Sequence, residues 1–250
     1  MKARQWCSLS YLLFFSFMLT DLAMANVKLS QVSVDLHDQA SLQRGARIFM
    51  NYCSGCHSLR YMRYNRMGQD LGLTKFAGHM DNTLLVNNLI FTTAEVEDPI
   101  EISMPATDAR RWFGIVPPDL SLKARERGPA WIYTYLKSFY SDKNRPFGAN
   151  NLLLPDVAMP NSLEPLQGTV IAEHRHDVGG LYSVSLKRVQ QGEMNEEQFD
   201  RALKDLVTFL VYVAEPVKLV RYRMGLGVIL FLCILIVVAY QLRQLYWRNR

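Results

Sequence analysis

Cys53, Cys56 and His57 form a Cys-x-x-Cys-His motif, which constrains the fold more than any other stretch of the chain. Two thiols three residues apart lie on one side of a helical turn, within reach of the two vinyl groups of a haem. The adjacent imidazole then faces the iron from the proximal side. The motif therefore predicts one covalently attached haem c, with His57 as an axial ligand.

A Cys-x-x-Cys pair also occurs in redox and zinc motifs. A redox pair is expected within a βαβ unit, and zinc requires a second pair of ligands. The remaining cysteines are Cys7 and Cys233, at opposite ends of the chain, and they provide no second pair. The sequence favours haem attachment over both alternatives.

The N-terminal segment indicates export. Residues 1–25 combine a basic start, an apolar run from Leu9 to Leu19 and the small-residue site Ala23-Met24-Ala25, the pattern of a cleaved signal peptide. An uncleaved anchor is the alternative, but the apolar run is short. We expect the mature protein to begin at Asn26.

A second apolar segment predicts a transmembrane anchor at residues 218–242. Its uncharged core from Gly225 to Leu242 would span about 27 Å as a helix, enough for a thin bilayer. Basic residues bracket this run, which disfavours the alternative of a buried core helix. The export signal then places residues 26–217, the haem domain, outside the cytoplasm and residues 243–250 inside it.

The formal charge of +5 does not describe the exported domain. Residues 26–217 contain 20 lysines and arginines against 22 aspartates and glutamates, a balance of −2. No basic stripe remains to neutralise phosphates, so nucleic acid is not an expected partner. An acidic group at Glu95, Glu97, Asp98 and Glu101 is either a solvated loop or a docking surface for a basic protein.

The patterning predicts a mainly α haem domain with long irregular loops and one C-terminal transmembrane helix. Apolar residues recur at helical spacing from a Ser41 cap to Cys53, which puts the haem motif at the end of an amphipathic helix. Gly45 lies on this helix, either because a close approach of another helix needs a small residue there or without any such role. Residues 141–195 show little periodicity and predict a long loop.

Further helices follow the Pro117-Pro118-Asp119-Leu120-Ser121 segment. Its prolines fix an extended turn in which Asp119 or Ser121 caps a helix through Arg125. Gly128-Pro129 breaks this helix, and another covers residues 131–140. A strong helix starts at an Asn195 cap and ends at Glu215-Pro216.

The second axial position of the iron decides what the haem does, because two strong ligands make an electron carrier and an empty site binds small molecules. Met104-Pro105 and Met159-Pro160 both lie in irregular segments that can wrap over a haem. The spacing alone does not choose between them.

Several longer motifs together resemble the cytochrome c1 family, the haem subunits of quinol–cytochrome c reductase (bc1) complexes. They are Arg44-Gly45, Cys53-x-x-Cys56-His57-Ser58, Trp112-Phe113-Gly114, Pro117-Pro118-Asp119-Leu120-Ser121, Ala124-Arg125, Trp131-Ile132-Tyr133-Thr134-Tyr135-Leu136, Ala158-Met159-Pro160-Asn161, Thr208-Phe209-Leu210, Ala214-Glu215-Pro216 and Arg223-Met224-Gly225-Leu226. The haem motif is shared by all c-type cytochromes, whereas the Pro-Pro-Asp-Leu-Ser segment and the junction with the anchor are more selective.

The resemblance implies roles for four further residues. Met159 is the second axial ligand, Arg125 pairs with a haem propionate, and Pro118 packs near the haem. Trp131 stands where many members carry a tyrosine that hydrogen-bonds a propionate, and its indole N–H is also a donor.

The same resemblance implies a one-electron carrier that accepts electrons from a Rieske iron–sulfur protein and passes them to a cytochrome c. Its partners are then cytochrome b and the Rieske subunit in a dimeric complex of the bacterial inner membrane, with the haem domain in the periplasm. The alternatives are the haem subunit of a terminal oxidase and an exported haem enzyme or sensor with an open iron site.

Overall fold

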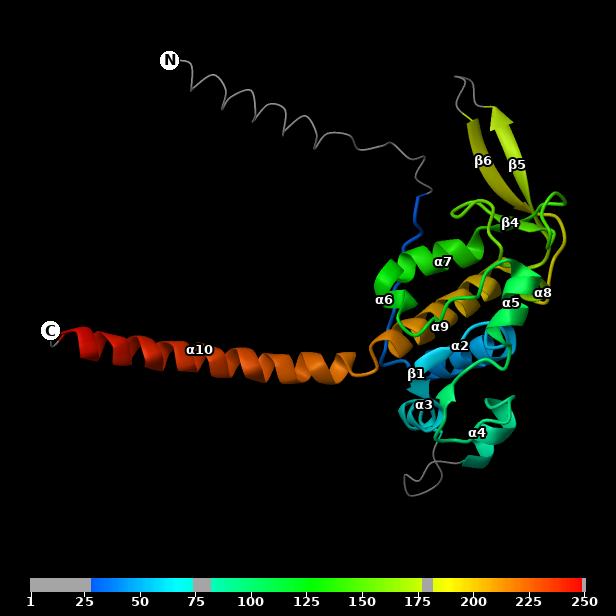
Figure 1. The fold of residues 1–250 in the computed structure, drawn as a ribbon. Helices are drawn as coiled ribbons and strands as arrows, with labels where there is room; N and C mark the ends of the chain where they lie inside the picture. The colour runs from blue at the N-terminus through cyan, green and yellow to red at the C-terminus, as the bar shows by residue number, and fades with distance from the viewer. Residues whose placement is uncertain (1–27, 74–81, 177–181, 249–250) are drawn as a thin grey trace, which may run out of the picture.

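The computed structural model describes residues 28–73, 82–176 and 182–248, and the expected signal peptide lies outside them. Helices dominate, as the patterning predicts (Figure 1). The helices are α2 (Gln39–Tyr52), α3 (Tyr64–Asp70), α4 (Asn82–Asn88), α5 (Ala106–Phe113), α6 (Lys123–Arg127), α7 (Pro129–Lys137), α8 (Glu164–Gln167), α9 (Glu196–Ala214) and α10 (Lys218–Arg248). Short antiparallel pairs join β1 (Leu59–Arg63) to β2 (Pro99–Ile100), β3 (Phe139–Ser141) to β4 (Ala149–Asn151), and β5 (Val170–His176) to β6 (Tyr182–Arg188).

Helices α2 and α9 cross at the centre of the domain, and the haem motif follows directly from α2 (Figure 1). Gly45 makes this crossing possible, because a Cβ atom there would lie 2.1 Å from the backbone oxygen of Asp205. The prediction of a close approach at Gly45 is confirmed. Asp205, which is buried, accepts hydrogen bonds from Ser41 Oγ (2.6 Å) and Arg44 Nε (2.6 Å), so polar contacts fix the crossing as well.

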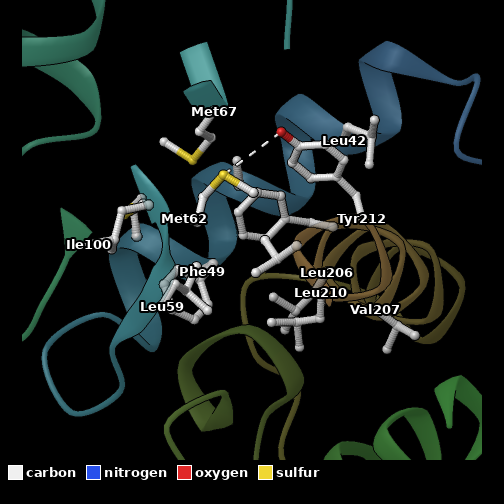
Figure 2. Close-up of a cluster of buried hydrophobic side chains, with 14 of the residues drawn as sticks. Leu42, Phe49, Leu59, Met62, Met67, Ile100, Leu206, Val207, Leu210 and Tyr212 are labelled. Atoms are coloured by element: carbon white, nitrogen blue, oxygen red, sulfur yellow. Dashed lines mark hydrogen bonds between the residues drawn. The ribbon is translucent and has the colours of Figure 1, made fainter. Parts of the chain in front are cut away.

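Apolar side chains from α2, β1 and α9 fill the core around this crossing (Figure 2). The rings of Phe49 and Phe209 pack with centroids 5.8 Å apart. Tyr212 reaches across this core, and its hydroxyl donates to Asp70 Oδ2 at 2.7 Å. Burial gives the haem motif a rigid support, because its preceding helix is packed along most of its apolar face.

The starts of the two central helices differ in how well the sequence predicts them. Asn195 caps α9 with a full capping box, in which Gln198 returns a hydrogen bond, as predicted. Ser41 does not cap α2. Asp38 accepts from the Ser41 N–H at 2.9 Å instead, because α2 begins at Gln39, three residues earlier than a Ser41 cap predicts, and leaves that N–H for the Asp38 carboxylate.

The prediction of one long loop over residues 141–195 is wrong in part. Strands β5 and β6, of seven residues each, form an antiparallel pair that projects from the domain on the side away from α10 (Figure 1). Alternating residues such as Val184 and Leu186 carry the strand signal within a stretch otherwise rich in turn residues. Residues 152–163, which precede α8 and include Met159, are irregular as expected.

Helix α10 is exposed along its described length and extends away from the domain (Figure 1). Its stretch Val220–Arg248 is long and apolar enough to cross a membrane. The helix runs past the predicted end of the anchor at residue 242, because residues 243–248 contain no Gly or Pro to stop it. Glu215 and Pro216 separate it from α9, as predicted.

Candidate haem site

The haem motif forms a compact turn at the end of α2. The N–H groups of Cys56 and His57 donate to the Cys53 carbonyl at 3.0 and 2.9 Å, and Cys53 N–H donates to Phe49 O. Cys53 and Cys56 are free thiols, half-buried in the turn. The turn therefore presents both sulfurs and the imidazole from one five-residue stretch, residues 53–57, anchored to a buried helix.

Burial raises the pKa of the Cys53 thiol to about 12, with a further contribution from Cys56, and burial also raises the pKa of Cys56. Redox-active Cys-x-x-Cys pairs show the opposite shift, which generates a thiolate at neutral pH. Among the described residues, no three His, Cys, Asp or Glu side chains gather to hold a metal ion. Both observations fit thiols destined for thioether bonds better than a redox or zinc pair.

His57 is oriented by the backbone of a distant segment. Its Nδ1 lies 2.8 Å from the carbonyl oxygen of Pro118. A carbonyl only accepts, so Nδ1 carries the proton and the neutral ring keeps a free lone pair on Nε2. Burial lowers the pKa of His57, and the bond to Pro118 opposes this shift in part. A neutral imidazole with a fixed tautomer is what an iron ligand requires.

The Pro-Pro-Asp-Leu-Ser segment runs beside the residues that follow the motif. Leu120 N–H donates to Ser58 O (2.9 Å), Asp119 Oδ2 accepts from Arg60 N–H (2.9 Å), and Ser121 Oγ accepts from Tyr61 N–H (3.2 Å). These bonds fix the position of the segment, so that the Pro118 carbonyl lies within hydrogen-bonding distance of His57. The prediction that Asp119 or Ser121 caps the next helix is wrong. Leu122 occupies the N-cap of α6, because both polar side chains accept hydrogen bonds from backbone N–H groups of β1 instead.

Met159 lies in the irregular segment before α8 and packs against the core. The Tyr135 hydroxyl donates a hydrogen bond to its Sδ atom at 3.4 Å. Burial raises the pKa of Tyr135 to about 12, so the hydroxyl keeps its proton and remains a donor. Met104, the other methionine left open by the spacing, is half-buried just before Pro105 at the start of α5.

Trp131 stacks on Tyr135, with ring centroids 5.1 Å apart and planes 8° apart. The Arg127 guanidinium also lies over the Trp131 ring, 5.2 Å from its centroid. The structure thus gives Trp131 a packing role beside Met159, and the propionate contact stays a prediction.

Arg125 is an exposed residue in the middle of α6, near the junction with the anchor. Its Nη1 is 3.8 Å from Glu215 Oε1 and it lines a cavity of about 310 Å³ with residues of the N-terminal arm and α9. Glu215 also pairs with Arg221 (3.0 Å) and Lys218 (3.9 Å). The role of Arg125 toward a propionate stays a prediction, since its partner here is the Glu215 carboxylate.

Two site residues were given no role by the sequence analysis, although Tyr135 belongs to the Trp131–Leu136 motif quoted there. Tyr135 falls on a helix as an ordinary apolar position, and Asn151 falls in the predicted loop. Asn151 is fully buried, donates from Nδ2 to the Tyr135 carbonyl (2.7 Å) and accepts from the N–H groups of Leu153 (2.9 Å) and Leu154 (3.1 Å). The adjacent asparagines at 150 and 151 were the sequence signal that could have indicated these contacts, because asparagine side chains bind nearby backbone groups and so shape irregular loops.

The residues present fit a covalently bound haem c. Two protonated thiols and an imidazole with a free Nε2 lie on one turn, and a thioether with its own hydrogen-bond donor lies on a separate loop. Thioether and imidazole donors together suit a haem iron that changes charge by one electron.

Comparison with known proteins places nearly the whole chain in one family. Residues 30–250 match the family model described as "Cytochrome C1 family". The chain is 47% identical over 224 residues to "Cytochrome c1" of Allochromatium vinosum, covering 88% of this chain and 89% of that protein. It is 40% identical over 223 residues to "Ammonia monooxygenase gamma subunit" of Nitrosomonas europaea, covering 89% of each. A chain of "Hyperthermophilic respiratory Complex III" aligns over 98% of this chain and 96% of its own length, with a TM-score of 0.39 and 16% identity, and carries no weight at that score.

Proposed function

The chain belongs to the cytochrome c1 family, and on this basis we propose that it is the electron-carrying haem subunit of a quinol–cytochrome c reductase (bc1) complex. The protein binds haem c covalently and is anchored in a membrane by α10. The observation that carries the proposal is the haem motif held by the Pro-Pro-Asp-Leu-Ser segment, within a family match that covers residues 30–250.

Cys53 and Cys56 hold the haem through thioether bonds, and His57 and Met159 are its axial ligands. The bound haem supplies a one-electron change at its iron. Pro118 fixes the His57 tautomer through its carbonyl, while Arg125 and Trp131 lie on the α6–α7 segment as candidate partners for the propionates. These assignments extend the family motifs residue by residue.

Electrons arrive from a Rieske iron–sulfur subunit and leave to a cytochrome c. The acidic group at Glu95, Glu97, Asp98 and Glu101 supports a docking face for the acceptor. All four residues are exposed and flank β2, which pairs with the strand that follows the haem motif. An exposed acidic field of this kind steers a basic partner into fast and reversible encounters.

The complex contains cytochrome b and is a dimer in the bacterial cytoplasmic membrane, with residues 26–217 in the periplasm, the anchor at 218–242 and residues 243–250 in the cytoplasm. The apolar α10 and the signal-like N-terminal sequence support this orientation. The relative from Nitrosomonas europaea supports a second candidate, a haem subunit of a monooxygenase. Its lower identity than that of the cytochrome c1 relative makes it the weaker one.

Purification through a tag on this chain in mild detergent tests the proposal. Two b-type haems, a Rieske EPR signal and quinol-driven reduction of cytochrome c are expected in the purified material. Copper with ammonia-dependent oxygen uptake would move the chain to the monooxygenase. Copper with a carbon-monoxide-binding haem b would move it to a terminal oxidase, and a reduced haem c that binds carbon monoxide would indicate an open iron site.

A further inference from the structure

Tyr135 and Met159 are 24 positions apart in the chain, yet the Tyr135 hydroxyl lies 3.4 Å from Met159 Sδ. A tyrosine hydroxyl that is taken from water needs a hydrogen-bond partner, and here that partner is a sulfur atom. Sulfur is a weak acceptor. The Tyr212 hydroxyl also approaches a sulfur, Met62 Sδ at 3.9 Å, but it donates to the Asp70 carboxylate at 2.7 Å. The pairing therefore points to a function of the sulfur rather than to the stability of the tyrosine.

The Tyr135 ring is held in place on two sides. Trp131 stacks on it from the preceding turn of α7, and Phe139 packs edge-on with its centroid 5.2 Å away. Aromatic contacts of these geometries add to the stability of a pair beyond area burial. The direction of the hydroxyl is thus fixed by the packing of these two rings.

The loop that carries Met159 is tied to the same helix. Asn151 binds the Tyr135 carbonyl with its Nδ2 and the N–H groups of Leu153 and Leu154 with its Oδ1. Asn150 Oδ1 accepts from Asp156 N–H at 2.9 Å, which closes the turn just before Met159. Asn150 and Asn151 therefore fix the loop of Met159, the acceptor, relative to the helix of Tyr135, the donor.

We propose that Tyr135 is a positioning residue whose hydrogen bond to Met159 Sδ raises the reduction potential of the haem. The inference rests on the proposed role of Met159 as an axial ligand. A hydrogen bond to sulfur withdraws electron density from the lone pairs that would bind iron. The ferric iron needs that density more than the ferrous iron does, so a weaker sulfur donor favours the reduced state.

The test is a redox titration of the haem c in the purified complex that carries Tyr135→Phe. We expect a lower potential than in the wild type, with the ferric methionine-to-iron charge-transfer band retained. Tyr133→Phe is the matched control, because Tyr133 lies on the same helix but interacts with Asp200 and Lys137 rather than with Met159. Its potential should equal that of the wild type.

A fluorinated tyrosine at position 135 provides a second measurement that preserves the ring and the packing. Its more acidic hydroxyl is a stronger donor, so the potential should rise, opposite to the effect of Tyr135→Phe. A potential that does not move with the fluorinated residue overturns the proposal, even if Tyr135→Phe fails to assemble.

Met159→Leu separates the inference from the site assignment. Loss of the charge-transfer band in this variant, together with unchanged potentials at position 135, would overturn the role of Tyr135 and leave Met159 as the ligand. Persistence of the band in Met159→Leu would overturn the ligand assignment and, with it, this inference.

Discussion

Nδ1 of His57 donates to the backbone carbonyl of Pro118 at 2.8 Å, across 61 positions of the chain. The bond leaves Nε2 free and sets the ring direction, and the charge of the Asp119 carboxylate adds an electrostatic contribution. Prolines at 117 and 118 restrict the backbone that offers this carbonyl. The segment thus acts on the site mainly through its backbone.

Asp119 holds that segment, so its loss should disturb His57. Asp119→Ala removes the acceptor for the N–H groups of Arg60 and Ser121. We expect a loss of about 1–3 kcal/mol in the free energy of unfolding, because two N–H groups lose their partners. Denaturant unfolding followed by haem absorbance measures it. Asp119→Asn keeps one acceptor oxygen and should lose less, and equal stability of the alanine variant and wild type would contradict the prediction.

Gly45→Ala should weaken the crossing of α2 and α9. The new Cβ atom would lie 2.1 Å from the Asp205 backbone oxygen, so the helices have to move apart. Overpacking of this kind costs about 1–3 kcal/mol or more. The melting temperature of the haem domain reports it. Gly227→Ala in α10, where no atom lies within 4 Å, is the control and should melt like wild type.

Met159→Leu should open the iron and lower its reduction potential, because a leucine offers no lone pair to the metal. Carbon monoxide binding by the reduced variant is the direct measurement. Met104→Leu makes the same change in the other loop methionine and should bind no carbon monoxide. The reverse pattern would move the axial ligand to Met104.

Glu215 makes the stability of the junction depend on pH. Its hydrogen bond with Arg221 holds its pKa below the ordinary value of 4.5, and Arg125 and Lys218 act in the same direction. A carboxyl with a lowered folded pKa stabilises the fold above its unfolded pKa, and this contribution disappears as the pH falls through the folded pKa. Glu215→Gln should therefore be less stable than wild type at neutral pH and equal to it at the acid end.

Thermal unfolding of the detergent-solubilised chain from neutral to acid pH measures this difference. Glu193→Gln, at an exposed glutamate ahead of α9, is the control for loss of a surface charge. If the melting temperatures of wild type and Glu215→Gln coincide across the whole pH range, the ion pairs of Glu215 contribute nothing to stability.

Local features of the sequence determined much of the architecture. The Cys-x-x-Cys-His spacing, the capping box at Asn195, the break at Gly128-Pro129 and the apolar run of α10 each depend on neighbours within a few residues. Gly45 was also predictable, because a glycine inside a regular helix needs a reason and close packing is the common one. These signals are readable because the physics that makes them is local.

The tertiary structure alone decided which distant groups meet. His57 binds Pro118, Asp119 binds β1 rather than capping a helix, and Tyr135 binds Met159 through a loop shaped by Asn151. A hydrogen-bonding side chain in the sequence has many possible partners, and only the folded chain selects one by bringing it within about 3 Å. The sequence by itself therefore predicts where a haem attaches, and the packing of segments far apart in the chain decides how the residues around that motif are held.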